Sequence, residues 1–133
     1  MKKSKYNAKK VEVDGIIFDS KMESEFYEYL LTKHRKEDIV LQPVYKLLDS
    51  FKDKKGKLVR GITYKADFEV LGVLYDVKGM ATPVFSIKEK LFKKRYPDIE
   101  LKCVTKAPNY SGVEWIEISE LKKLRKARKN KKD

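Results

Sequence analysis

The amino-acid sequence predicts one small α/β domain with a mixed sheet. The chain has 133 residues, about the length of a single domain, and 41% of them are hydrophobic, which permits a modest core. Segments that alternate apolar and polar residues, as strands do, are interspersed with segments in which apolar residues recur at helical spacing. No repeat and no linker divides the chain. The predicted order of the core elements is helix, three strands, helix, strand.

A hairpin and a helix are predicted at the start of this domain. Residues 11–18 alternate and turn at an Asp-Gly pair, which is a short hairpin signal. Asp19 or Ser20 then caps a helix that runs to about His34. The apolar side chains of this helix recur at helical spacing and are predicted to face the core: Met22, Phe26, Tyr29 and Leu30.

Two long strand segments are predicted next, at 39–50 and 58–70. The first is rich in apolar residues, but Pro43 interrupts it, which indicates an edge strand or a strand that begins after the proline. A polar turn at 51–57 separates the two segments. The second segment is predicted to be one continuous strand, with a bulge indicated at Gly61.

The segment 64–79 is predicted to form two strands that fold back on each other at Leu71-Gly72. The side chains of a strand point alternately to its two faces. Strict alternation therefore gives this segment a charged face and an apolar face, and the aromatic residues of the apolar face are predicted to lie in the core rather than to stack on bases. The apolar face contains Tyr64, Ala66, Phe68, Val70, Val73, Tyr75 and Val77.

The charged face carries the candidate functional residues. With a two-residue turn, Asp67 lies opposite Asp76 and Lys65 lies opposite Lys78. Like charges that directly oppose each other are destabilising, and a cation between the two carboxylates would remove that repulsion. Mg²⁺ is suitable because it takes oxygen ligands and keeps several waters for substrate phosphates. Such an ion polarises a phosphoryl oxygen and lowers the pKa of a bound water.

Two further side chains are predicted to complete this site. Lys78 lies two residues after Asp76, on the same side, where it can orient a water or stabilise developing negative charge. A third carboxylate is expected from the preceding helix, and Glu23 is the candidate because it lies at the margin of the buried side. Glu25 stays open as the alternative acid. Glu69 is assigned to the rim of the site, and Gln42 is expected to approach it from the adjacent strand.

The remaining elements are a helix, two strands and a basic C-terminal helix. Thr82 is predicted to cap the helix and Pro83 to occupy its first position. The strands are predicted at 99–104, which alternates as a central strand does, and at 113–118. Ser119 is predicted to cap a C-terminal helix that runs to about residue 129. The apolar residues of the helix after Thr82 that are predicted to face the core are Ile87, Leu91, Val84 and Phe92.

The net charge of +12 is concentrated at the two ends of the chain. Residues 1–10 carry five lysines and no acid, and 119–133 carry eight basic and two acidic residues, which leaves +1 for 11–118. The chain is therefore divided into a flexible basic N-terminus, a globular domain and a basic C-terminal helix. Such ends suit a polyanion, most simply nucleic acid, although lysine-rich ends also keep small proteins soluble. The predicted nucleic-acid contacts are Lys65, Lys90, Lys94, Lys122 and Lys126.

The residue content argues against several classes of protein. Cys103 is the only cysteine and His34 the only histidine, so an intramolecular disulfide and a cysteine-based zinc site are excluded, and a histidine mechanism is poorly supported. No apolar run approaches the 18 or so residues of a membrane span. The N-terminus lacks the apolar core of a secretory signal. We therefore expect a cytoplasmic protein that is not inserted in a membrane.

The candidate site resembles that of the PD-(D/E)XK nuclease superfamily. The matching pieces are the helix that begins Ser20-Lys21-Met22-Glu23, the Asp67 that ends Tyr-Lys-Ala-Asp, and Asp76-Val77-Lys78. The chain departs from the pattern at Ala66, where the superfamily name has proline, and uses Asp76 where glutamate is more frequent. More narrowly, the sequence resembles a family of small bacteriophage and prophage proteins assigned to that superfamily, through Phe18-Asp19-Ser20-Lys21, Gln42-Pro43, Tyr64 to Phe68, Asp76 to Gly79 and Lys90-Leu91-Phe92.

This resemblance covers about residues 11–104 and implies a small restriction-endonuclease-like α-β-β-β-α-β core. It further implies Mg²⁺-dependent cleavage of DNA phosphodiesters, with Mn²⁺ able to substitute. Asp67, Asp76 and Glu23 would bind the metal, and Lys78 would be catalytic.

The leading hypothesis is a phage-encoded endonuclease that acts on branched recombination or replication intermediates, as a Holliday-junction resolvase does. A resolvase is expected to form a homodimer, because two strands must be cut symmetrically. The alternative hypothesis is a non-catalytic DNA-binding or replication accessory protein that keeps the nuclease fold. An Asp-x-Lys pattern can also arise by chance as a solvated ion pair worth about 0–1 kcal/mol.

Overall fold

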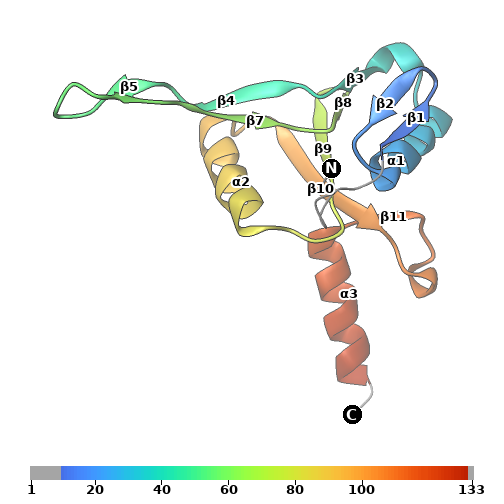
Figure 1. Ribbon diagram of the computed structural model, residues 1–133. Coiled ribbons are helices and arrows are strands. Elements are labelled where there is room, and N and C mark those ends of the chain that lie inside the picture. Colours follow the sequence, from blue (N-terminus) through green and yellow to red (C-terminus); the bar gives the residue numbers. More distant parts are fainter. Residues whose placement is uncertain (1–9, 132–133) are drawn as a thin grey trace, which may run out of the picture.

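A computed structural model describes residues 10–131 (Figure 1). Its centre is a five-stranded sheet in the order β11-β10-β9-β8-β3. Strands β9 and β10 run parallel, and the other neighbours are antiparallel. The predicted α/β class and mixed sheet are therefore confirmed, and β10 lies inside the sheet as predicted. The bounds of these strands are Ile39–Leu41 (β3), Phe68–Val70 (β8), Val73–Val77 (β9), Glu100–Lys106 (β10) and Trp115–Glu117 (β11).

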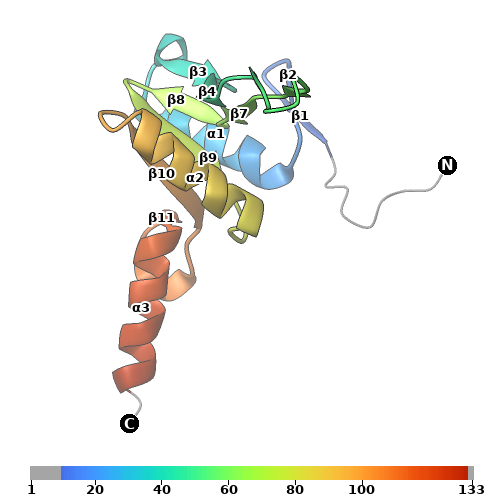
Figure 2. The same cartoon turned by 90° about the vertical axis from the view of Figure 1, so that its left-hand side faces the viewer.

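Two helices cover opposite faces of the sheet (Figure 2). Helix α1 (Lys21–Lys33) buries Phe26 and Leu30 against one face, in a cluster that includes Phe68. Helix α2 (Pro83–Arg95) packs on the other face, in a cluster that includes Leu74. The predicted bounds of α1 are confirmed: the Ser20 hydroxyl accepts a hydrogen bond from the Glu23 backbone N–H at 3.1 Å, as a cap does.

The N-terminal hairpin is also confirmed, as β1 (Val11–Val13) and β2 (Ile16–Phe18). The predicted flexibility of 1–10 concerns residues that lie, except Lys10, outside the described part of the chain. At the other end, α3 (Ile118–Lys131) projects away from the sheet and buries only Leu121 (Figure 1). Ser119 lies inside the first turn of α3, so its prediction as the cap is wrong. No helix within 10–131 is long and apolar enough to cross a membrane.

The buried face of α2 differs from the prediction. Thr82 caps the helix and Pro83 begins it, as predicted. The fully buried side chains are Phe85 and Phe92, two helical turns apart, whereas Ile87 is 59% exposed. The pair of aromatic residues sets the orientation of the helix, because each buries more area than an aliphatic side chain can. The predicted core positions of Ile87 and Val84 are therefore wrong.

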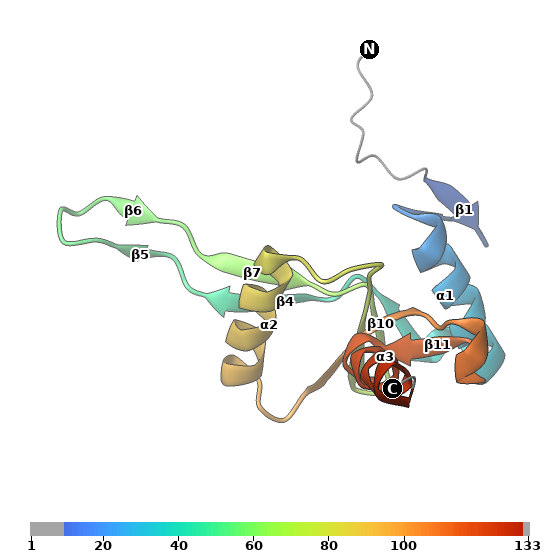
Figure 3. The ribbon, with the colours of Figure 1, turned by 90° about the horizontal axis from the view of Figure 1, so that it is seen from below.

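The segment predicted as one strand over 58–70 is divided among three strands. Its first two parts belong to a long hairpin, residues 44–65, which projects from the domain and which we call the arm (Figures 1 and 3). The polar turn of the arm is confined to residues 53–57, since 51–52 pair with 58–59. The strands of the arm are β4 (Val44–Leu48), β5 (Phe51–Lys52), β6 (Leu58–Val59) and β7 (Ile62–Lys65).

A bend at Ala66-Asp67 separates the arm from the central sheet. The Gln42 N–H donates to the Asp67 carbonyl at 3.0 Å, and the Ala66 N–H donates to the Pro43 carbonyl at 3.1 Å, so both strands of the ribbon bend together. Gln42 adopts a left-handed conformation with φ of 48° to allow this. Strand alternation is interrupted at the bend.

Two sequence predictions fail because of this interruption. Tyr64 and Ala66 pack with Leu74 on the α2 side of the sheet, not with Phe68 and Val70 on the α1 side. Lys65 lies opposite Val44 within the arm, so the predicted pairing of Lys65 with Lys78 is wrong.

Candidate active site

The hairpin that carries the candidate site has the predicted register. Phe68 pairs with Tyr75 and Val70 with Val73, which leaves Leu71-Gly72 as a two-residue turn. Both turn residues have positive φ, 49° and 86°, as the tight turns of two-residue hairpins often require. Asp67 precedes β8 and Asp76 lies near the end of β9, so the register brings the two acids to the same end of the hairpin.

Asp67 is held by main-chain hydrogen bonds on both sides. Its N–H donates to the Tyr75 carbonyl at 3.1 Å. Its carboxylate Oδ2 accepts from the Val77 N–H at 2.7 Å, so the side chain reaches across to the strand that carries Asp76. Asp67 Oδ1 accepts no hydrogen bond from any residue in 10–131 and is the oxygen left to bind another group.

Asp76 is 3% exposed and both of its carboxylate oxygens have partners. Oδ1 lies 3.0 Å from Lys78 Nζ. Oδ2 accepts a short hydrogen bond from the Tyr64 hydroxyl. The Lys78 ammonium also lies 4.7 Å from the ring centre of Phe85, the first buried residue of α2, in a cation–π contact. These contacts fix Asp76 and Lys78 on the face of the sheet that α2 covers.

Glu23 approaches Asp67 from α1. Glu23, Gln42 and Asp67 line a common cavity of about 130 Å³, together with apolar side chains of β2 and Leu41. Burial raises the pKa of the Glu23 carboxyl, and the negative charges of Asp19 and Asp76 raise it further. Glu25 instead forms an ion pair with Lys106. Of the two helix acids considered from the sequence, Glu23 is the one that the fold places beside Asp67.

The electrostatics of the site disfavour the ionised forms of Asp67 and Glu23. Burial raises the pKa of Asp67 to about 7, and the negative charge of Asp76 contributes to this shift. The Val77 N–H opposes the shift, Glu23 adds to it and Lys78 opposes it. Burial also raises the pKa of the Tyr64 hydroxyl, which therefore stays protonated and donates to Asp76. A cation near Asp67 would favour its ionised carboxylate and so lower its pKa.

The donor set fits a hard cation. No three His, Cys, Asp or Glu residues within 10–131 come together closely enough to form a ready-made metal site. Mg²⁺ usually needs only one or two protein carboxylates, because waters and substrate phosphates complete its octahedron. Asp67 offers a free carboxylate oxygen, and Asp76 offers its remaining lone pairs.

The five lysines predicted to contact nucleic acid are all exposed. Lys65 ends the arm next to the bend, Lys90 and Lys94 lie on α2, and the other two lie on α3. Lys122 lines a cavity with α2 residues, among them Lys93. The fold thus distributes these lysines over three elements rather than gathering them at Asp67.

The sequence interpretation missed one residue that the fold brings to the site. Tyr64 was assigned to the opposite face, because strict alternation ignores the bend before Asp67. Glu69, assigned to the rim, accepts a hydrogen bond from the Tyr45 hydroxyl at 2.6 Å and so connects β8 to the arm. The only sequence signal for the bend is Pro43. It interrupts the segment 39–50, and its carbonyl accepts the hydrogen bond from the Ala66 N–H at the bend.

A family described as "Protein of unknown function (DUF1064)" matches residues 3–112. The chain belongs to this family. The DUF1064 match includes Glu23, Asp67, Asp76 and Lys78 as well as the whole arm, and it ends before α3. No curated protein matches the chain. No solved structure matches it either.

Proposed function

We propose that this protein is a metal-dependent DNA endonuclease of the PD-(D/E)XK type. The observation that carries the proposal is the position of Asp67 relative to Asp76. The Asp67 carboxylate is bound to the backbone of β9 at Val77 N–H, one residue beyond Asp76, and Asp76 itself holds Lys78 Nζ at 3.0 Å. Two acids and a lysine meet at one buried end of a hairpin, in the order in which the superfamily pattern has them.

Each side chain has a distinct role in this proposal. Asp67 and Asp76 would hold Mg²⁺ or Mn²⁺, with Glu23 lining the cavity beside Asp67. The bound ion would supply positive charge to a scissile phosphate and acidify a water. Lys78 would orient the attacking water or stabilise the charge that develops on the phosphate. Tyr64 is a positioning residue, because its hydroxyl fixes the orientation of Asp76.

The proposed substrate is DNA, on which the basic character of the chain acts through phosphate contacts. The small size of the chain and the lack of an obvious sequence-reading domain favour branched recombination or replication intermediates as the substrate class. Such an enzyme would act in the cytoplasm of the host cell, as a homodimer that cuts two strands symmetrically.

The test uses the purified chain with Mn²⁺ or Mg²⁺ and a panel of labelled linear, flap and four-way DNA substrates. We expect cleavage that Asp76→Asn and Lys78→Ala abolish while DNA binding persists. Asp98→Asn and Lys21→Ala are matched controls, because both residues are exposed and lie outside the site. Full cleavage in EDTA would overturn the proposal. A second contrary outcome combines two results: Asp76→Asn loses DNA binding, and Lys78→Ala keeps its cleavage activity.

One observation favours the second candidate, a DNA-binding protein without catalytic activity. Both oxygens of Asp76 already have partners in Lys78 and Tyr64, an arrangement that also serves a purely structural ion pair. This candidate predicts salt-sensitive DNA binding that is lost when the two basic ends are trimmed. It also predicts no cleavage of any substrate with any divalent metal, which separates it from the endonuclease.

A further inference from the structure

The arm, residues 44–65, projects from the rest of the fold (Figures 1 and 3). Its outer strands β5 and β6 pair only two residues each. Every residue from Phe51 to Leu58 is exposed. The outer half therefore contributes no buried side chain to either core. A segment of this kind is retained in a fold for contacts with something outside it.

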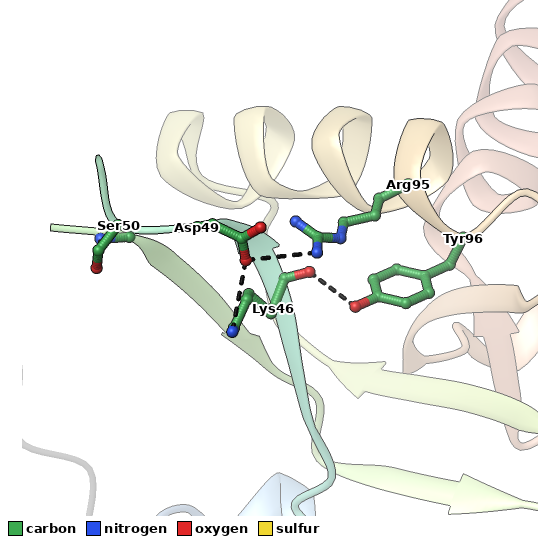
Figure 4. A network of polar contacts seen from close by, with 6 residues as sticks. Lys46, Asp49, Ser50, Arg95 and Tyr96 are labelled. Carbon is green, nitrogen blue, oxygen red and sulfur yellow. Dashed lines mark hydrogen bonds and ion pairs between the residues drawn. The ribbon is translucent and has the colours of Figure 1, made fainter. Parts of the chain in front are cut away.

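The base of the arm is fixed to the domain by α2 (Figure 4). The Tyr96 hydroxyl donates to the Lys46 carbonyl at 2.8 Å. Arg95 Nη2 and Lys46 Nζ both lie beside Asp49 Oδ1, at 3.5 and 3.4 Å. Exposed ion pairs contribute only about 0–1 kcal/mol each, so packing makes the larger contribution: Leu47 is buried, and the Tyr45 ring meets Phe92 edge-on. A rigid base holds the direction in which the tip points.

The arm is strongly basic. It contains seven Lys and Arg residues against two aspartates, a net charge of +5. One aspartate, Asp49, is paired at the base. The other, Asp53, uses Oδ1 to accept the N–H groups of Lys55 and Lys57 at 2.9 Å each, which fixes the turn. The arm residues with basic side chains are Lys46, Lys52, Lys54, Lys55, Lys57, Arg60 and Lys65.

The positive charge at the tip is not neutralised within the molecule. None of Lys54, Lys55 and Lys57 forms an ion pair with an acidic residue in 10–131. Gly56 takes a φ of 80° between them and allows the tight turn. Three unpaired ammonium groups on a fixed turn suit a polyanion rather than an apolar partner.

We propose that the arm is a DNA-binding β-ribbon, and that it follows duplex DNA outward from the candidate active site. This proposal rests on the proposed endonuclease function, because β7 leads directly into Asp67. A strand rises about 3.3 Å per residue, so the tip at Gly56 lies roughly 30 Å from the base at Lys65. That length corresponds to about nine base pairs, since stacked base pairs of a duplex are about 3.4 Å apart.

The two-stranded shape of the arm favours duplex DNA over duplex RNA as its partner. The major groove of B-form DNA is about 12 Å wide and admits a two-stranded ribbon. The deep, narrow major groove of A-form RNA does not admit side chains. The tip lysines would then contact phosphates on either side of the groove. Duplex DNA is therefore the partner, with the arm lying on one side of the scissile bond.

The test compares two triple variants of the full chain that remove equal charge. The arm variant is Lys54→Gln/Lys55→Gln/Lys57→Gln, in which the Asp53 turn persists because it uses backbone N–H groups. The control is Lys33→Gln/Arg35→Gln/Lys36→Gln, whose residues lie at the C-terminal end of α1 and in the three residues that follow it, and α1 lies on the other side of the fold from the tip of the arm (Figure 1). Binding to a 30-base-pair DNA duplex, to a duplex RNA of the same sequence and to a 10-base-pair DNA is measured in EDTA, over a range of salt, with footprinting on the long DNA.

The wild-type chain is expected to prefer the long DNA to the RNA. The arm variant should bind the long DNA about tenfold or more weakly, with a salt slope reduced by about 2.7 for three lost phosphate contacts. Its footprint should shorten at one end by about three to five base pairs, and its binding to the 10-base-pair DNA should change little. An arm variant that matches the control in affinity, salt slope and footprint would overturn the proposal, as would equal binding of duplex RNA.

The same samples separate this inference from the proposed function. Arm-dependent binding without cleavage in Mg²⁺ or Mn²⁺ would support the arm proposal and overturn the endonuclease. Cleavage with a footprint that does not depend on the arm would do the reverse.

Discussion

Tyr64 and Asp76 are joined by a hydrogen bond from the phenol to the carboxylate, across the bend that separates the arm from the central sheet. Tyr64 is 3% exposed and Asp76 is equally buried. When a buried carboxylate loses a hydrogen-bond partner, the free-energy cost of its desolvation is no longer offset. The orientation of the site therefore depends on a residue of the arm.

Tyr64→Phe tests this dependence. We expect it to destabilise the fold by about 1–3 kcal/mol, because a hydrogen bond to a charged group is lost. We also expect Mn²⁺ to bind about tenfold or more weakly, as when the partner of a metal ligand is removed. Denaturant unfolding and Mn²⁺ titration measure the two effects. The control is Tyr110→Phe, whose ring is exposed; equal effects of both variants would contradict the prediction.

The raised pKa of Asp67 predicts a pH-dependent stability. The ordinary value is 3.8 and the folded value is about 7, so between these values the folded state binds more protons than the unfolded state. The free energy of unfolding of the metal-free protein should therefore fall as the pH rises from about 4 to 7, by at most about 4 kcal/mol. Thermal unfolding in EDTA across this range measures the fall.

Asp67→Asn is the control for this titration, since an amide cannot ionise, and its stability should vary less over the same pH range. A bound cation favours the ionised carboxylate, so Mg²⁺ should raise the melting temperature of the wild type more at pH 8 than at pH 5. A wild-type curve that rises with pH between 4 and 7, or one that Asp67→Asn leaves unchanged, would show that Asp67 is not the titrating group.

The buried face of α2 can be tested with one pair of substitutions. Phe92 is fully buried and its ring lies 5.3 Å from that of Tyr45 and 5.8 Å from that of Tyr64. Phe92→Ala should cost about 3–5 kcal/mol of stability. Ile87→Ala should cost under about 0.5 kcal/mol, because Ile87 is exposed. If chemical denaturation shows that the two variants lose similar amounts of unfolding free energy, the sequence prediction that Ile87 faces the core would be supported instead.

Gly61 tests the packing at the base of the arm. A Cβ added at Gly61 would lie 2.3 Å from the Leu48 carbonyl oxygen, which belongs to the facing backbone. Gly61→Ala should therefore destabilise the arm by about 1–3 kcal/mol, seen as faster amide exchange in 44–65. Gly79→Ala is the matched control, because the nearest atom to its Cβ is Met22 Cε at 4.0 Å. Unchanged exchange in Gly61→Ala would contradict the close approach.

Local signals were sufficient to predict much of the fold. The caps at Ser20 and Thr82, the tight turn at Leu71-Gly72 and the inner strand β10 all follow from short-range chemistry, and each is confirmed. The same turn is enough to predict that Asp67 and Asp76 lie at one end of a hairpin. Their proposed roles in metal binding and catalysis stay predictions.

The errors arise where tertiary contacts override local patterns. The bend at Ala66-Asp67 depends on hydrogen bonds to Gln42 and Pro43, which are distant in sequence, so alternation continued through it gave the wrong face for Tyr64. The register shift in the arm lies between Lys46 and Leu48, on the strand opposite Gly61, where the sequence indicated the bulge. The arm itself was not predicted, because a strand in an arm and a strand in a sheet have the same periodicity.

The anchoring of Asp67 has a consequence for heat inactivation. Its carbonyl accepts from Gln42 in the edge segment, its N–H donates to Tyr75, and its carboxylate accepts from Val77. Edge strands open more readily than central ones. Release of Gln42 would free Asp67 on one side while the central sheet stays folded. Any function that needs Asp67 in place should therefore fail at a lower temperature than the one at which the sheet melts.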